Sequence, residues 1–261
     1  MTRSRSDPYR WRFRGGSSPT APHPASMTWR HGLFVHWPVD ADALASRVPP
    51  ELTLETREGR AWVSVVPFVL VDVGIRGSPS FTRLAVPELN VRTYVRYRGD
   101  PGLYFFSIDL GRRLFATMIA RATRLPVSPA SIRVSALEDH VAFSCDRPLQ
   151  PFSRSADDER RSGAGPQARF EATYEPVGET FRPDPDSLAH WLVERRRFYA
   201  PGDGHVLAGE IAHEPWPLQP ADVTIYENTM LEVNGLPSPV DDPVVHYCSE
   251  LPMTGSIPRR V

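Results

Sequence analysis

Polar and apolar residues alternate strictly from Glu88 to Val95, and this period of two predicts a β-strand. One face of the strand would carry a carboxylate, an amide, a guanidinium and a phenol, in the order Glu88, Asn90, Arg92 and Tyr94. An Arg-Gly-Asp-Pro-Gly sequence follows, and then a second, aromatic run from Leu103 to Ile108. Turn residues between two such runs predict a β-hairpin. This hairpin, residues 87–109, carries the most distinctive polar pattern of the chain.

The rest of the pattern predicts many short strands and two main helices. In one apolar run Pro67 predicts a bulge or a break, because proline donates no hydrogen bond to a neighbouring strand. Helical spacing is found at about 110–124 and 187–198, and a short helix over 41–47 follows Asp40. Apolar or alternating runs predict the other strands, at 32–38, 61–73, 131–146 (a hairpin), 169–176, 205–213, 221–226, 229–235 and 244–248. This mixture predicts an α+β fold.

Two expectations concern the segment that links the hairpin to the first main helix. Asp109 stands just before the helix, and we expect it to cap the N-terminus. Phe105, Ser107 and Asp109 are expected to share one face of the second strand. The apolar positions of the helix would face the core; they are Leu110, Leu114, Met118, Ile119 and Ala122.

Composition predicts one folded domain with an N-terminal arm. Residues 1–26 are rich in Arg, Ser, Pro and Gly and show no apolar period, which is typical of a disordered basic arm. Residues 27–261 would form a single domain, and 147–167 reads as a polar loop inserted into it. No apolar stretch follows the basic N-terminus, so a secretory signal is not expected.

Charge and cysteine content limit the possible binding partners of the protein and the cellular compartment in which it is expected. A net charge of −1 argues against a nucleic-acid partner, which requires a basic face. No apolar run approaches the roughly 20 residues that span a bilayer, so no membrane partner is expected. Cys145 and Cys248 are far apart in sequence and are expected to be reduced thiols of a cytoplasmic protein. A small-molecule ligand is the partner that remains, and a homo-oligomer stays open.

The basic residues exclude one class of mechanism. Every one of them is arginine, and the chain contains no lysine. Imine chemistry needs an amine that can lose its proton, and a guanidinium does not do so in the accessible pH range. Phosphate loops, nucleophile elbows and close His or Cys pairs are also missing from the sequence. A metal held by His36, His213 and Glu88 is conceivable but not favoured, and we expect no metal and no cofactor.

The polar row on the first strand of the hairpin has two interpretations. The alternation by itself slightly favours a face exposed to water. If the row instead faces inward, a buried carboxylate must be paired or protonated, and a buried guanidinium must meet an anion. Such a cavity would suit a small acid or carbonyl compound. Arg92 would hold its carboxylate or enolate, and Glu88, with a pKa raised by burial, would carry protons.

Several segments resemble the YqjF-like family, also called the DUF2071 domain. The most specific segment is Pro-Glu-Leu-Asn-Val-Arg-Thr-Tyr at 87–94, and the resemblance is collinear from about residue 28 to the C-terminus. The other segments are 33–39, 59–68, 102–109, 191–195 and 213–218. The family is similar to the acetoacetate decarboxylase-like fold. That likeness implies a large, mostly antiparallel sheet curled into a cone around a cavity, and it favours the inward interpretation of the polar row.

The chain also departs from these relatives. The imine lysine of the decarboxylase has no counterpart, since the chain has no lysine. The Leu-Pro-Tyr that usually follows the first helix in the family is Leu-Pro-Val here, ending at Val127. An aromatic residue that commonly follows Glu-Arg in the later helix is Arg196. The resemblance therefore implies the scaffold and part of its polar lining, and not decarboxylation through an imine.

The candidate site combines the hairpin with polar residues of two other segments. Glu88 and Arg92 are the expected catalytic residues, as proton carrier and anion clamp. The expected ligand-binding residues are His36, Asn90, Tyr94, Ser107, His213 and Trp216. Three functions stay open: lysine-independent acid-base chemistry on a carbonyl or carboxylate compound, non-catalytic binding or sensing of a small molecule, and action through the surface alone with the interior filled by side chains.

Overall fold

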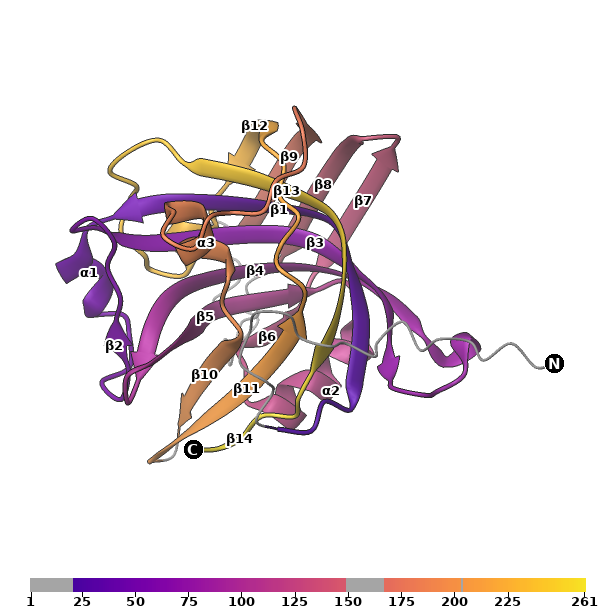
Figure 1. The fold of residues 1–261 in the computed structure, drawn as a ribbon, viewed down its shortest axis with the longest axis horizontal. Coiled ribbons are helices and arrows are strands. Elements are labelled where there is room, and N and C mark those ends of the chain that lie inside the picture. The colour runs from indigo at the N-terminus through magenta and orange to yellow at the C-terminus, as the bar shows by residue number, and fades with distance from the viewer. Residues whose placement is uncertain (1–20, 149–166, 203) are drawn as a thin grey trace, which may run out of the picture.

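The computed structural model describes residues 21–148, 167–202 and 204–261 (Figure 1). Most of the predicted arm and nearly all of the predicted loop at 147–167 lie outside these residues. The first strand, β1, begins at Ala25, so the last residues assigned to the arm belong to the sheet. No helix among the described residues combines the length and the apolar character that crossing a membrane requires.

Seven strands of the described chain form a closed ring, and this confirms the predicted α+β fold with a sheet curled around a hollow. Neighbouring strands are antiparallel except where β10 meets β5. The β4–β5 hairpin closes the ring. In order, the ring strands are β4 (Leu84–Tyr97), β3 (Ala61–Ile75), β1 (Ala25–Val39), β13 (Val244–Gly255), β11 (His205–His213), β10 (Arg197–Gly202) and β5 (Asp100–Leu110). Short strands extend it: β2 (Thr53–Leu54), β6 (Val127–Pro129) and β14 (Arg259–Arg260).

The central hairpin forms where the pattern predicts it. Tyr97 pairs with Asp100, so the turn consists of Arg98 and Gly99 alone. Both have positive φ, 51° and 89°, as a two-residue turn between twisted strands requires. Farther along, Val91 pairs with Ser107 and Arg92 with Phe105, so Phe106 is an extra residue in β5. This bulge changes which side chains of β5 face the interior.

A second, four-stranded sheet covers the outside of the ring. It consists of β7 (Ser131–Leu137), β8 (His140–Arg147), β9 (Ala168–Pro176) and β12 (Ala221–Asn228). Its apolar face packs against the outward side chains of β3 and β4, including Val63, Leu89 and Val91. β4 is therefore buried on both faces, and the two interpretations of its polar row are decided by this second sheet. The predicted pairing of β9 with the strand before the loop is confirmed.

The long strand β3 runs through Pro67 without a break. Opposite this residue the register of β1 shifts between Arg30 and Val35, and His31 adopts a positive φ of 50°. The missing N–H of proline is thus accommodated by a bulge in the neighbouring strand. Residues 61–68 are buried throughout, as expected for a strand covered on both sides.

The helices differ most from the sequence predictions. α1 (Ala41–Ala45) is confirmed, with Asp40 Oδ1 accepting from the Ala43 N–H at 2.8 Å. α3 (Leu188–Val193) is shorter than predicted, because the chain from Arg197 onward pairs as β10. Residues 229–235 were expected to be a strand, but they contain the helix α4 (Met230–Val233).

Helix α2 (Arg113–Thr123) lies at one end of the ring (Figure 1). The expectation that Asp109 caps it is wrong: Asp109 belongs to β5, is fully buried, and pairs with Arg147 at 2.7 Å. The predicted inner stripe is wrong at Leu114 and Met118, which are 88% and 55% exposed, whereas Ile119 lines the cavity as expected of an inner position. The inner face is formed by Phe115, Ala116 and Ile119, so Phe115 takes the inward position expected of Leu114. The helix begins later than predicted, and this moves its apolar face.

Candidate functional site

A cavity of about 270 Å³ lies inside the ring, and all seven ring strands contribute to its wall. The wall is mainly aromatic and aliphatic, with Trp29, Phe68, Phe105, Phe115, Phe198 and Met253 among its residues. Helix α2 contributes Phe115 and Ile119, one helical turn apart, and so closes one end. Few polar residues reach the wall, and most of them come from β4.

Glu88, Asn90 and Arg92 bring the polar row of β4 to the cavity wall. Asn90 and Arg92 are only 3% and 6% exposed, and Glu88 keeps part of its surface accessible because it faces the hollow. The β4–β5 register sets Glu88 beside Leu110 and Asn90 beside Ile108. The interior position of the row therefore follows from the pairing of the hairpin with its neighbours.

Glu88 carries a carboxyl group whose pKa lies near neutrality. Burial raises its pKa to about 7. The hydrogen bond from Asn90 Nδ2 to Glu88 Oε1, at 3.3 Å, and the charge of Arg92 oppose this rise, while Asp109 adds to it. At pH 7 the protonated and ionised forms are therefore both well populated. Such a group can give or take a proton without a large change in free energy.

Arg92 is a buried cation without a carboxylate partner among the described residues. Its guanidinium lies over the ring of Phe34, 5.6 Å from the centroid, and its Nε has no hydrogen-bond partner. Burial lowers the pKa of Arg92, and the neighbouring Tyr94 and Glu88 raise it. An arginine stays charged in such surroundings, and an unpaired buried charge is costly. An anion in the cavity would remove that cost.

Tyr94 and His36 lie behind the wall and do not line the cavity. With Ser64 they form a buried network: Ser64 Oγ lies 2.6 Å from Tyr94 Oη and 2.7 Å from His36 Nδ1, and Tyr94 Oη lies 3.0 Å from His36 Nδ1. Burial lowers the pKa of His36 well below its usual value, with contributions from His246 and Arg92. His36 is thus a neutral member of a network that supports Arg92 through Tyr94.

His213 and Trp216 are also one step away from the cavity. His213 Nδ1 donates to the carbonyl of Glu214 at 2.7 Å, so its Nε2 carries a lone pair, and that atom is buried without a partner. Burial, together with the charge of Arg196, lowers the pKa of His213 to about 3. Trp216 packs edge-on against Trp29, whose ring lines the cavity, at 5.0 Å between centroids. Neither residue reaches the wall.

Ser107 lies on the opposite face of β5, which corrects the prediction that it shares a face with Phe105. The bulge at Phe106 shifts the alternation, so Phe105 and Ile108 face the cavity, while Ser107 lies on the outward face of the ring with its strand partner Val91. Its hydroxyl accepts a hydrogen bond from Asn234 Nδ2 at 3.2 Å. No local pattern in the sequence reveals an extra residue of this kind, because the bulge is defined by the neighbouring strand.

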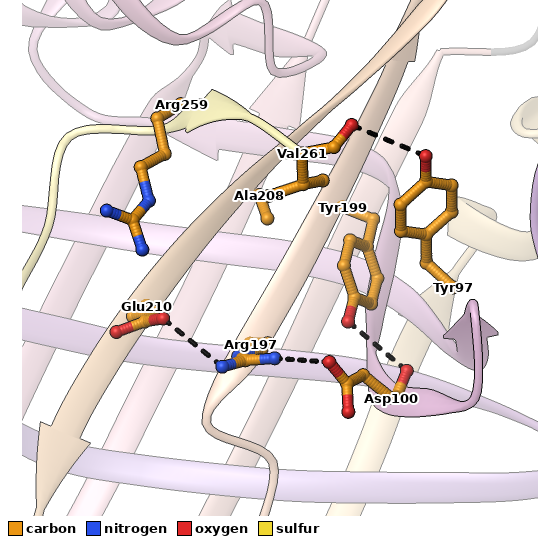
Figure 2. A pocket seen from close by; sticks show the side chains of 8 residues that line it. All are labelled: Tyr97, Asp100, Arg197, Tyr199, Ala208, Glu210, Arg259 and Val261. Atoms are coloured by element: carbon orange, nitrogen blue, oxygen red, sulfur yellow. Dashed lines mark hydrogen bonds and ion pairs between the residues drawn. The ribbon is translucent and has the colours of Figure 1, made fainter. Parts of the chain in front are cut away.

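The sequence prediction missed Glu210, an 8% exposed carboxylate on β11 that lines the cavity. Glu210 also borders a second, smaller pocket of about 80 Å³ (Figure 2). There Arg197 bridges Asp100 at 2.6 Å and Glu210 at 3.4 Å, and the Tyr199 hydroxyl donates to the Asp100 carbonyl. The charges of this pocket compensate one another, in contrast to Arg92.

Metal ligands do not cluster in the part of the chain that the structure describes: no group of at least three His, Cys, Asp or Glu side chains could hold an ion there. His36 and His213, which the sequence left as conceivable ligands with Glu88, are both engaged in other hydrogen bonds. The two cysteines, Cys145 and Cys248, are buried free thiols.

Comparison with known proteins identifies relatives over nearly the whole chain. The DUF2071 profile, described as an uncharacterized conserved protein, matches residues 26–252. The uncharacterized protein YqjF of Bacillus subtilis (strain 168) is 36% identical over 225 residues, which cover 86% of this chain and 87% of YqjF.

Solved structures with the same fold are much more distant in sequence. The enduracididine biosynthesis enzyme MppR, complexed with pyruvate, is 14% identical with a TM-score of 0.61, covering 94% of this chain and 93% of MppR. Acetoacetate decarboxylase from Legionella pneumophila is 13% identical with a TM-score of 0.56, covering 95% and 92%. An acetoacetate decarboxylase-like enzyme from Sphingomonas wittichii RW1 is 12% identical with a TM-score of 0.54, covering 92% and 94%. These similarities establish an acetoacetate decarboxylase-like fold.

Proposed function

The chain belongs to the DUF2071 family, and from its central cavity we propose that it binds a small carboxylate or carbonyl compound and moves a proton on it without a lysine. Arg92 holds the carboxylate or enolate oxygen, and Glu88 takes and returns the proton. The observation that carries this proposal is the buried guanidinium of Arg92, which has no carboxylate partner among the described residues and lines the same cavity as a carboxyl group with a pKa of about 7.

The electrostatics support an anionic ligand. A buried cation is tolerated when an anion accompanies it, and the fork of donors on a guanidinium matches a carboxylate. When Glu88 is protonated, Arg92 is left as an uncompensated positive charge beside the cavity. A bound carboxylate would supply the missing negative charge and would give Arg92 Nε a hydrogen-bond partner.

The chemistry that fits these groups is proton transfer at a carbon next to a carbonyl. Glu88 would accept the proton as a carboxylate, the electrons of the C–H bond would move onto the carbonyl oxygen as an enolate, and Arg92 would stabilise that charge. Protonation of the enolate by Glu88 would complete the cycle. The lack of lysine excludes an imine route. MppR, which shares the fold, has been solved with pyruvate, a small acid of this class.

A non-catalytic binding or sensing protein on the same scaffold is the second candidate. The observation that favours it is that His36 and His213, the other expected polar partners of the ligand, are neutral and lie behind the wall, which leaves the proposed proton transfer to Glu88. The cavity itself argues against action through the surface alone. We also propose a cytoplasmic location, supported by two buried cysteines that stay unpaired.

Exchange of carbon-bound protons in D₂O tests the proposal directly. Pyruvate and its longer homologue 2-oxooctanoate would be incubated with the protein, and loss of the proton signal at C3 would be followed by NMR. We expect exchange in the wild type, a loss of at least about 100-fold in Glu88→Gln with binding retained, and weaker binding in Arg92→Met. Ser107→Ala, on the opposite face of β5, is the matched control and should exchange like the wild type.

The outcomes separate the two candidates. Binding that depends on Arg92, with no exchange in either the wild type or Glu88→Gln, would identify the non-catalytic alternative. Absence of any Arg92-dependent binding of either acid, in protein that gives a cooperative unfolding transition, would reject both. Native mass spectrometry of the purified protein would report any small molecule that it retains.

A further inference from the structure

We propose that the natural ligand is a carboxylate with an apolar chain of about eight carbons, its head group at Arg92 and its chain against the wall that α2 completes. This inference rests on the proposed function, and it names the substrate class. It follows from the size of the cavity, the position of its polar groups and the character of the remaining wall.

The polar groups that a ligand could use are confined to one strand of the described cavity wall. Glu88, Asn90 and Arg92 stand on β4, whereas the two other polar side chains on the wall are engaged elsewhere. Glu210 pairs with Arg197 and lies 3.7 Å from His23, and the Ser256 hydroxyl accepts from the Glu210 N–H at 2.8 Å. A ligand that is polar at both ends would leave its second polar group unpaired against hydrocarbon. The arrangement therefore favours a ligand with one charged end.

The volume sets the size of the ligand. Benzene, with six non-hydrogen atoms, occupies an engineered cavity of about 150 Å³. On that scale the cavity of about 270 Å³ holds roughly 11 non-hydrogen atoms, the size of nonanoate or 3-phenylpropanoate. On the same scale acetate would leave more than half of the cavity empty, and pyruvate a little less than half. Glu88 and Arg92 are four residues apart on a strand, which is about 13 Å of backbone, so the cavity is also long enough for an extended chain.

The apolar part of the wall can bury such a chain. Phe115 and Ile119 project from α2, and Leu125 and Val127 follow in the segment after the helix. Each methylene transferred from water to such surroundings contributes a factor of about four in affinity. We therefore expect octanoate to bind with roughly 200-fold higher affinity than butyrate. The increase in affinity must stop when the chain is longer than the cavity.

Isothermal titration calorimetry with the full chain tests the inference. Acetate, butyrate, octanoate, 3-phenylpropanoate and dodecanoate would be titrated, with 1-octanol as the uncharged match for octanoate. We expect affinity to rise steeply to octanoate and 3-phenylpropanoate, to fall for dodecanoate, and to be at least about 10-fold weaker for 1-octanol. The Ile119→Phe variant should weaken octanoate at least about 10-fold and leave acetate unchanged.

Met118→Phe is the matched control, because Met118 is adjacent on α2 but faces outward, and it should bind octanoate like the wild type. If Ile119→Phe fails to fold by circular dichroism, Leu125→Phe fills the same wall. Short acids that bind through Arg92 with no gain from chain length would overturn this inference and leave the proposed function standing. Equal binding of 1-octanol and octanoate, or no binding of any acid, would overturn both.

Discussion

The feature that suits Glu88 to proton transfer, its raised pKa, also lowers the stability of the folded protein when the carboxyl group is ionised. Its pKa is about 7 in the folded protein and 4.5 as the ordinary value, so the folded state holds its proton more tightly than the unfolded chain. Stability then falls as the pH rises through the window from about 4.5 to 7, because ionisation is harder in the fold. The ionised carboxylate at pH 8 is expected to cost on the order of 3 kcal/mol.

Glu88→Gln should therefore stabilise the protein at pH 8 by on the order of 3 kcal/mol and change little at pH 4. Urea unfolding of both proteins at these two pH values measures the difference. Asp109, whose pKa burial raises to about 6, and the neighbouring Arg92 are present in both proteins, so the difference isolates Glu88. The same gain at both pH values would show that packing of the amide, and not the proton, is responsible.

Arg92 is expected to oppose stability for the same reason that it suits a ligand. Arg92→Met removes a buried charge that has no carboxylate partner among the described residues, and it should raise the free energy of unfolding by about 1–3 kcal/mol while abolishing anion binding. Thermal and urea unfolding without ligand measure this change.

Arg195→Met is the contrasting control. Arg195 is as deeply buried but pairs with Glu55 at 2.5 Å, so its loss removes one of the two arginine partners of that buried carboxylate and should cost about 1–3 kcal/mol, since Arg96 still pairs with Glu55 at 2.6 Å. If both substitutions destabilise the protein to a similar degree, Arg92 is satisfied within the fold, and the case for an anion site is lost.

At the scale of elements, α2 is the helix for which the sequence pattern predicts the wrong buried face. Leu114 and Met118 have helical spacing and predict an inner stripe, yet both are exposed. The helix begins at Arg113 because residues up to Leu110 are held in β5, which pairs at this end with β4 and β6. This start places Phe115 and Ile119 over the cavity.

The sequence pattern predicts that truncating Leu114 costs more stability than truncating Phe115. From the structure we expect the reverse. Leu114→Ala is expected to change the free energy of unfolding by less than about 0.5 kcal/mol, whereas Phe115→Ala, which removes cavity wall, should cost roughly 1–3 kcal/mol. Urea unfolding of the two variants measures both values. A larger loss for Leu114→Ala would mean that this face of the helix is covered in solution.

Local patterns predicted the strands better than the helix ends. The β4–β5 hairpin and the β7–β8 hairpin were predicted because alternation and turn residues are both local signals. The strand at β10 and the helix α4 were missed, because their conformation depends on partners distant in sequence. β10 is extended by its pairing with β11 and β5, not by its own propensity.

At the scale of the whole molecule, the hollow is a consequence of two sheets. The ring brings residues of seven described strands around one space, and the second sheet covers the outer face of β3 and β4. Polar side chains on β4 then have no route to water except through the cavity. Three of the eight predicted site residues line it, namely Glu88, Asn90 and Arg92, and the others lie behind it or on the opposite face.

The sequence by itself determined the alternation of β4, the hairpin, the family and the exclusion of lysine chemistry, because each depends on residue identity and local spacing. Only the tertiary structure decided that the charged face of β4 looks into the hollow. A strand has two faces of equal local geometry, and the choice between them is made by which neighbour covers the apolar one. The bulge at Phe106 and the buried face of α2 were decided in the same way, by pairing and packing across the ring.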